Sequence, residues 1–397
     1  MKYVDEFRDP DKAQTLLRAI GEQVERIERD SGGPRTIAIM EVCGGHTHAI
    51  FRYGIETMLP AQIELVHGPG CPVCVLPIGR VDDCVAIAET PGVIFTTFGD
   101  AMRVPGSRKS LLEAKAGGAD VRMVYSPLDA LELAKQHPTR QVVFFGLGFE
   151  TTMPSTALTL LEAAREGIEN FSLFCNHITI IPTIEAILAA PGLAIDGFLG
   201  PGHVSMVIGN APYRFIAERY HRPLVVTGFE PLDVLQGIWM VLEQIARGEA
   251  KIENQYARVV GEQGNQAALA AIAEVFELRD HFEWRGLGSI DHSGVKIRPA
   301  YARFDAERKF AIPDLRVADP QACQCGEVLK GALKPHDCQL FGAECTPETP
   351  MGALMVSSEG ACAAYHRYCR VEKLVELRGP LRDRLRGPLR GQLRGPE

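Results

Sequence analysis

The stretch that decides the fold is Thr36-Ile-Ala-Ile-Met-Glu-Val-Cys-Gly-Gly-His-Thr-His48, an apolar run followed at once by a thiol, two glycines and two imidazoles. The apolar run over residues 36–40 predicts a buried strand. Parallel α/β sheets bind ligands at the carboxyl ends of their strands, and glycines there let the backbone approach a bound group. Cys43 is therefore a candidate functional residue. The alternative is a small buried side chain, as free cysteines often are.

Strand and helix patterns alternate along most of the chain. An amphipathic helix is predicted over residues 11–30, and Ser31-Gly-Gly-Pro34 ends it. Further strands are predicted at 63–66, 93–98, 121–125, 141–145, 171–174, 197–199 and 224–227. Further helices are predicted at 81–89, 110–116, 127–136, 154–164, 183–189, 232–245 and 266–278. Such alternation predicts an α/β fold, with parallel sheets covered by helices.

The alternating pattern restarts at residue 141. It predicts two similar parallel-sheet α/β domains facing a cleft, over residues 34–140 and 141–250, followed by a smaller Cys-rich domain over residues 251–376. The helix within residues 1–33 is expected to pack on that third domain. Residues 377–397 repeat Leu-Arg-Gly-Pro with variations and are expected to be disordered. Such a basic tail also suits an acidic partner, but a solvated linker is the simpler interpretation.

The composition limits which cellular compartment and which classes of binding partner we expect. The N-terminus is polar and no apolar run reaches the roughly 18 residues that span a bilayer, so we expect a cytoplasmic protein with no membrane partner. In that compartment the eleven cysteines indicate metal or redox chemistry rather than a disulfide scaffold. The formal net charge of −8 argues against nucleic acid as the partner.

The second candidate element is the pair Cys71-Pro-Val-Cys74, which follows the predicted strand at 63–66. A Cys-x-x-Cys loop closes a disulfide reversibly or holds a soft metal with two thiolates. A zinc finger needs a second pair at suitable spacing, and the next cysteine, Cys84, lies ten residues on within a predicted helix. The spacing favours a redox pair, with metal ligation and a structural role as alternatives.

The third element is a cysteine-rich C-terminal segment, where six of the eleven cysteines fall between residues 323 and 369. An iron–sulfur cluster needs four thiolates, and structural zinc is bound similarly. The long gaps after the first two cysteines differ from the short pairs of ribbon-type zinc sites and favour iron–sulfur. The candidate ligands are Cys323, Cys325, Cys338, Cys345 and Cys362.

Polar side chains also follow the strands predicted in the second domain, and together they favour a binding cleft. They are Glu150, Thr151, Thr152, His177, His203 and Glu230. Singly they admit simpler explanations, since Thr152 can cap a helix and His177 can be a satisfied core histidine. The pair Gly146-x-Gly148 lacks the third glycine of a dinucleotide fingerprint, so a nicotinamide cofactor is not expected.

Several motifs, in the same order, resemble the HypD family of hydrogenase maturation proteins. They are Cys43-Gly-Gly-His-Thr-His48, Gly68-Pro-Gly-Cys-Pro-Val-Cys74, Gly148-Phe-Glu-Thr-Thr152, Pro201-Gly-His-Val-Ser205, Cys345-Thr-Pro-Glu348 and Ser358-Glu-Gly-Ala-Cys362. The resemblance extends to about Tyr368 and leaves out the tail. It implies two α/β domains and a third domain that carries the cluster.

The resemblance also implies a function: a redox-active scaffold, rather than a conventional turnover enzyme, for assembling the Fe(CN)2CO centre of nickel–iron hydrogenase. Cys43 matches the family's iron-holding cysteine, and a HypC-type chaperone supplies the other protein ligand. A HypE-type protein donates cyanide, and the hydrogenase large subunit is an indirect partner. His46 and His48 then support the Cys43 thiolate, and we group Glu150 with these catalytic residues.

The other family cysteines divide into a redox pair and a cluster. Cys71 and Cys74 match the pair, and we expect electrons to reach it from a 4Fe–4S cluster. The matching cluster ligands are Cys338, Cys345, Cys362 and either Cys323 or Cys325, while Cys369 is a spare. The alternative function is a thiol-disulfide oxidoreductase that carries an iron–sulfur cluster and acts on other proteins.

Overall fold

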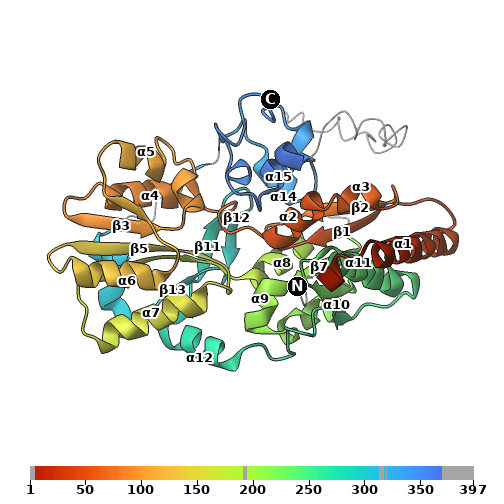
Figure 1. The fold of residues 1–397 in the computed structure, drawn as a ribbon, viewed down its shortest axis with the longest axis horizontal. Helices are drawn as coiled ribbons and strands as arrows, with labels where there is room; N and C mark the ends of the chain where they lie inside the picture. Colours follow the sequence, from red (N-terminus) through yellow and green to blue (C-terminus); the bar gives the residue numbers. More distant parts are fainter. Residues whose placement is uncertain (1–4, 191–194, 313–316, 319, 369–397) are drawn as a thin grey trace, which may run out of the picture.

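The computed structural model describes residues 5–190, 195–312, 317–318 and 320–368. Two parallel sheets occupy opposite ends of the long axis, and the C-terminal segment lies above the region between them (Figure 1). Cys369 and the Leu-Arg-Gly-Pro tail fall outside the described residues. Among the described residues, no helix is both long and apolar enough to cross a membrane.

The first sheet has five strands in the order β2-β1-β7-β8-β9, all paired in parallel. Its strands are β1 (Ile37–Glu41), β2 (Ile63–His67), β7 (Gly197–Pro201), β8 (Leu224–Thr227) and β9 (Ile252–Asn254). Helices α1 (Pro10–Ser31) and α11 (Pro231–Ala246) bury their apolar stripes against one face. The other face packs against α8 (Ile180–Ala189), α9 (Gly202–Ile208) and α10 (Arg214–Tyr220).

The second sheet has four parallel strands in the order β4-β3-β5-β6. Its strands are β3 (Val93–Thr97), β4 (Val121–Met123), β5 (Gln141–Gly148) and β6 (Phe171–His177). Helices α4 (Ile78–Ala88) and α5 (Leu111–Ala116) cover one face, and α6 (Pro127–Gln136) and α7 (Met153–Arg165) cover the other. Strands β3, β5 and β6 are buried almost throughout, which explains why they are rich in apolar residues, whereas the edge strand β4 is buried only at Val121.

Sheet membership corrects the division predicted at residues 140 and 141. The chain leaves the first sheet after β2, builds the whole second sheet, and returns at β7, which pairs with β1. Strand–helix alternation looks the same in both sheets, because the local pattern does not record which strands pair. The α/β class is confirmed, but the two sheets interleave in sequence.

The N-terminal helix and the C-terminal segment also differ from expectation. Helix α1 packs on α11 and the first sheet, not on the Cys-rich segment, because Ile20, Val24 and Ile27 form one apolar stripe that meets α11. A separate Cys-rich domain is not seen. Instead, the helices of the Cys-rich segment pack on the rest of the protein. Both α14 (Cys325–Leu329) and α15 (Ala361–Tyr368) contribute residues to the apolar cluster that includes one face of the first sheet. Helix α15 also packs against Phe51, in the helix that follows β1.

The remaining elements are short. Two antiparallel pairs, β10 with β13 and β11 with β12, follow α12. These are α12 (Gln266–Val275), β10 (Phe276–Leu278), β11 (His281–Trp284), β12 (Gly288–Asp291), β13 (Val295–Ile297) and α13 (Ala306–Lys309). Two short helices, α2 (Gly44–Arg52) and α3 (Ile55–Met58), come between β1 and β2.

Candidate functional site

A cavity of about 320 Å³ lies where strand ends from both sheets meet. Its walls include Cys43 after β1, Asp100 after β3, Gly148 at the end of β5 and His203 after β7. The cleft expected between the carboxyl edges of two sheets is therefore confirmed. Cys71 lines the same cavity, so two of the three cysteines singled out near the N-terminus face one space.

The Cys43 loop is held by unusually close backbone packing. Cys43 is the residue before the first turn of α2, and its own side chain makes no capping hydrogen bond. The next amide, Gly44 N–H, donates to the Gly70 carbonyl at 3.0 Å. A Cβ on Gly70 would lie 2.2 Å from the Cys43 nitrogen, so only glycine allows these two loops to touch.

The Cys43 thiol is buried and protonated at neutral pH. Burial raises its pKa to about 12, and the negative charges of Glu359 and Glu41 add to the rise, while the backbone N–H groups of Gly45 and His46 lower it. A soft cation bound at the sulfur would reverse this balance, because metal coordination deprotonates a thiol outright. The environment therefore suits a metal ligand better than a free nucleophile.

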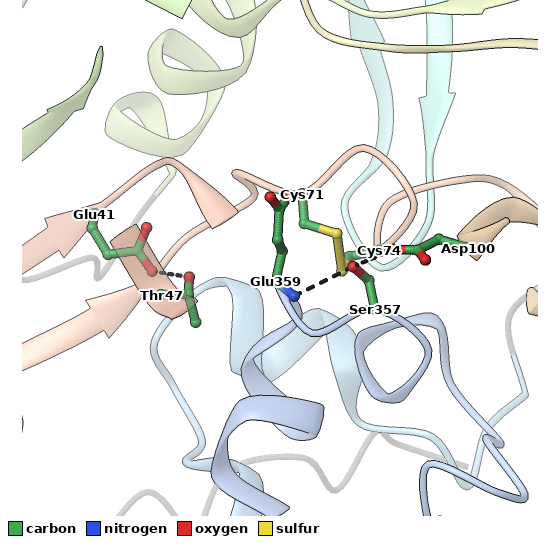
Figure 2. Close-up of a disulfide and its surroundings, with 7 residues drawn as sticks. All are labelled: Glu41, Thr47, Cys71, Cys74, Asp100, Ser357 and Glu359. Carbon is green, nitrogen blue, oxygen red and sulfur yellow. Dashed lines mark hydrogen bonds between the residues drawn. A yellow bond between two sulfur atoms is a disulfide. The ribbon is translucent and has the colours of Figure 1, made fainter. Parts of the chain in front are cut away.

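Cys71 and Cys74 are joined by a disulfide with their Cα atoms 5.3 Å apart. A loop from the C-terminal segment covers it (Figure 2). In that loop, the Ser357 hydroxyl donates to Asp100 Oδ2 at 3.0 Å, and the Glu359 N–H donates to Ser357 Oγ at 3.3 Å. The Cys71–Cys74 disulfide, the Cys-rich segment and the loop after β3 thus meet at one point.

His46 and His203 lie on either side of one aromatic ring. Phe229 stacks on His203 at a centroid distance of 3.8 Å and on His46 at 4.7 Å. His46 Nε2 lies 3.1 Å from the carbonyl oxygens of Thr227 and Gly228, and burial lowers its pKa. A neutral His46 that donates to these carbonyls supports α2 rather than coordinating a metal through Nε2.

His48 lies away from the cavity. It is on α2, and its ring meets the edge of Tyr368 on α15 at a centroid distance of 6.1 Å. It is absent from the cavity lining. The two histidines of the motif, predicted to act together, therefore face different surroundings.

The second-sheet candidates divide between the cavity and the core. Thr151 and Thr152 line the cavity. His177 lies beneath them, 3.4 Å from Thr152 Oγ1 through Nδ1 and 3.0 Å from Thr156 Oγ1 through Nε2. Burial lowers the His177 pKa to about 4, so this histidine is neutral. It has the contacts of a satisfied core residue.

Glu150 and Glu230 do not line the cavity. Glu150 is buried, with Oε1 accepting from the Ile180 N–H at 3.1 Å, and burial raises its pKa to about 7. Glu230 is the N-cap residue of α11 and forms an ion pair with Arg8 at 2.5 Å. These structural contacts account for an acidic residue at this strand end without a role in the cavity.

The C-terminal cysteines fit an iron–sulfur cluster in chemistry, but their side chains are not arranged as a ready ligand set. Within the described residues, no three His, Cys, Asp or Glu side chains are grouped as a metal site. Cys323 Sγ donates to Cys325 Sγ at 3.1 Å, and a Cβ on Gly352 would lie 2.5 Å from both sulfurs. Cys325, Cys345 and Cys362 lie in the same apolar cluster. Such a crowded, buried set of thiols suits soft metal chemistry.

Sequence reasoning missed several residues of this site. Asp100 was visible only as a residue shortly after a predicted strand, Glu359 belonged to a motif noted for its cysteine, and Ser357 directly precedes that motif. Phe229 carried no signal, because an aromatic residue after a strand is most often core. Only the folded chain brings these residues together, because they follow strands of two different sheets or belong to the C-terminal segment.

Comparison with known proteins agrees with the geometry. The model of the HypD family, described as "Hydrogenase formation hypA family", matches residues 15–369. The hydrogenase maturation factor HypD of Rhodobacter capsulatus is 61% identical over 372 residues, covering 93% of this chain and 98% of that protein. HypD of Escherichia coli (strain K12) is 57% identical, covering 94% and 99%. HypD of Cupriavidus necator is 49% identical, covering 94% and 99%.

Proposed function

The chain belongs to the HypD family and has a role in hydrogenase maturation; from this premise we propose that it is the scaffold on which the Fe(CN)2CO centre of nickel–iron hydrogenase is assembled. Cys43 holds the iron as cargo, and a HypC-type chaperone supplies a second thiolate. A HypE-type protein brings the cyanide. The observation that carries the proposal is that Cys43 and Cys71, one half of the Cys71–Cys74 disulfide, line one cavity.

The Cys43 side chain suits this cargo for two reasons. A thiolate is a soft ligand and suits iron bearing cyanide and carbonyl. The thiol also makes no capping hydrogen bond to α2, so its sulfur is available to a group bound in the cavity. His46 fixes the first turn of α2 from behind, through the carbonyls that follow β8.

The disulfide gives the cavity a redox group. Reduction breaks the S–S bond, takes up two electrons and two protons, and leaves two thiols; an external one-electron donor protein supplies the electrons. Glu359 lines the same cavity and offers a carboxyl group for one of these protons (Figure 2). The reduced pair lies next to the space where the iron acquires its ligands.

A 4Fe–4S cluster on the C-terminal segment would be held by Cys338, Cys345, Cys362 and either Cys323 or Cys325, and when bound it supplies one-electron transfer. Cys362→Ser tests the assignment, and Cys84→Ala, a buried cysteine in a different apolar cluster, is the matched control. We expect the Cys362 variant to lose most iron and acid-labile sulfide while the control keeps both. Equal cluster content in the two variants would exclude Cys362 as a ligand.

The scaffold is tested by native mass spectrometry of the complex with HypC, purified anaerobically. We expect an added mass of iron with two cyanides and one carbonyl in the wild type and in Cys84→Ala. Cys71→Ser and Cys74→Ser should lack the complete ligand set. A fully ligated iron in both of these variants would remove the redox pair from the mechanism.

The alternative, a thiol-disulfide oxidoreductase acting on other proteins, is less well supported. Cys71 is 4% exposed and Cys74 is 1% exposed, beneath the loop that carries Glu359. A sulfur attacked by the thiolate of another folded protein must be accessible. Reduction of disulfides in unrelated proteins, without iron or HypC, would favour the oxidoreductase.

A further inference from the structure

We propose that Glu41 is a positioning residue that fixes the Cys43 loop so that its sulfur faces the cavity. The proposal rests on the proposed role of Cys43 as the iron ligand. It concerns how that thiol is held, a role that the sequence motif itself did not indicate, because Glu41 lies between the predicted strand at 36–40 and the Cys-Gly-Gly element.

Glu41 is the last residue of β1, and its side chain is fully buried. Both carboxylate oxygens are used. Oε2 accepts from the Cys43 N–H at 2.9 Å, and Oε1 accepts from the Thr47 hydroxyl, as Figure 2 shows. Oε1 also lies 2.8 Å from Nδ1 of His67. A buried carboxylate with three partners is costly to disturb, since each lost partner leaves a polar group unsatisfied.

The geometry makes Glu41 the cap of α2. An ordinary cap uses the side chain of the residue before the first turn, but that residue is Cys43, whose thiol makes no such bond. Glu41 accepts hydrogen bonds from the Cys43 N–H and from the Thr47 hydroxyl, so it ties the N-terminal part of α2 to the end of β1. A carboxylate also suits the positive end of the helix dipole. The sulfur is thereby left free.

The same carboxylate connects the loop to the C-terminal segment. Glu41 and His67 are register partners on β1 and β2. The His67 ring packs against Phe51 of α2 at 5.0 Å and against Tyr365 of α15 at 5.9 Å. His67 therefore links the Glu41 carboxylate to both α2 and α15.

The role follows from the hydrogen-bond contacts of the carboxylate to Cys43, Thr47 and His67. A neutral side chain of the same shape can keep these contacts and should therefore keep the function. In Glu41→Gln, the amide oxygen accepts from the Cys43 N–H, and the amide N–H2 donates to Thr47 and to the His67 ring in its other tautomer.

The test measures alkylation of Cys43 by iodoacetamide in metal-free protein, read from the Cys43 peptide by mass spectrometry. The buried Cys84 serves as the internal reference for intact folding. We expect Glu41→Leu to raise the Cys43 rate by about tenfold, and Thr47→Val, which removes one donor, by about fivefold. Glu41→Gln should stay within about threefold of the wild type, because it retains the bond to Cys43.

Two results would overturn the proposal. One is unchanged Cys43 reactivity in Thr47→Val and Glu41→Leu with Cys84 still protected. The other is a Glu41→Gln rate as high as that of Glu41→Leu, which would make charge, not position, the cause. If Glu41→Leu does not fold, Thr47→Val and Glu41→Gln decide alone. Because no iron is present, the result is independent of whether Cys43 is the iron ligand.

Discussion

Glu150 gives the stability of this protein a pH dependence that can be calculated. Burial raises its folded-state pKa from 4.5 to about 7. A carboxyl group with a raised pKa binds its proton more tightly in the folded chain, so its contribution to stability is present at low pH. That contribution is lost as pH rises from about 4.5 to about 7, because the folded protein must then hold a buried charge.

The size follows from the shift. At about 1.4 kcal/mol per pKa unit, the raised pKa of Glu150 lowers the free energy of unfolding by about 3 kcal/mol at pH 8 but only by about 1 kcal/mol at pH 5.5. Glu150→Gln removes the titration and keeps an acceptor for the Ile180 N–H. Its free energy of unfolding relative to the wild type should rise by about 2 kcal/mol between pH 5.5 and pH 8.

Urea denaturation at several pH values measures this difference directly, since all other titrating groups cancel between the two proteins. A Glu150→Gln profile parallel to that of the wild type would refute the reasoning, and would mean that water or a cation reaches the Glu150 carboxyl.

Two further predictions concern the packing that holds the site. Gly70→Ala should destabilise the fold by roughly 1–3 kcal/mol in urea denaturation, because its Cβ would lie 2.2 Å from the Cys43 nitrogen; Gly33→Ala, with open space around its Cβ, should stay within about 0.5 kcal/mol of the wild type. Arg80→Met should cost about 3 kcal/mol by the same assay, since it removes one partner of the largely buried Glu307. A loss below about 1 kcal/mol, typical of an exposed pair, would contradict that account.

Local patterns in the sequence predicted most elements but not their pairing. The helix predicted at 127–136 coincides with α6, and the strand predicted at 93–98 overlaps β3 closely. Both follow from periodicity and from the turn residues that flank them. The division at residue 141 was wrong for the sheets, because the choice of partner for β3 depends on side chains distant in sequence.

The site shows the same limit. Cys43 and Cys71 were recognisable from residue type and spacing, and both line the cavity. Helix α2 is not among the helices predicted from the sequence, because Gly44 and Gly45 are poor helix formers. Contacts with residues distant in sequence also hold this helix, such as Gly44 N–H with the Gly70 carbonyl and His46 with the carbonyls of Thr227 and Gly228. Such contacts leave no local signal.

The central claim, that Cys43 holds the iron, is tested most directly by infrared spectroscopy of the complex with HypC, purified anaerobically. We expect cyanide and carbonyl stretching bands in the wild type and in Cys84→Ala. We expect their loss in Cys43→Ala, while the iron and sulfide of the cluster remain. Bands of undiminished intensity in Cys43→Ala, or no bands in the wild type with HypC bound, would contradict it.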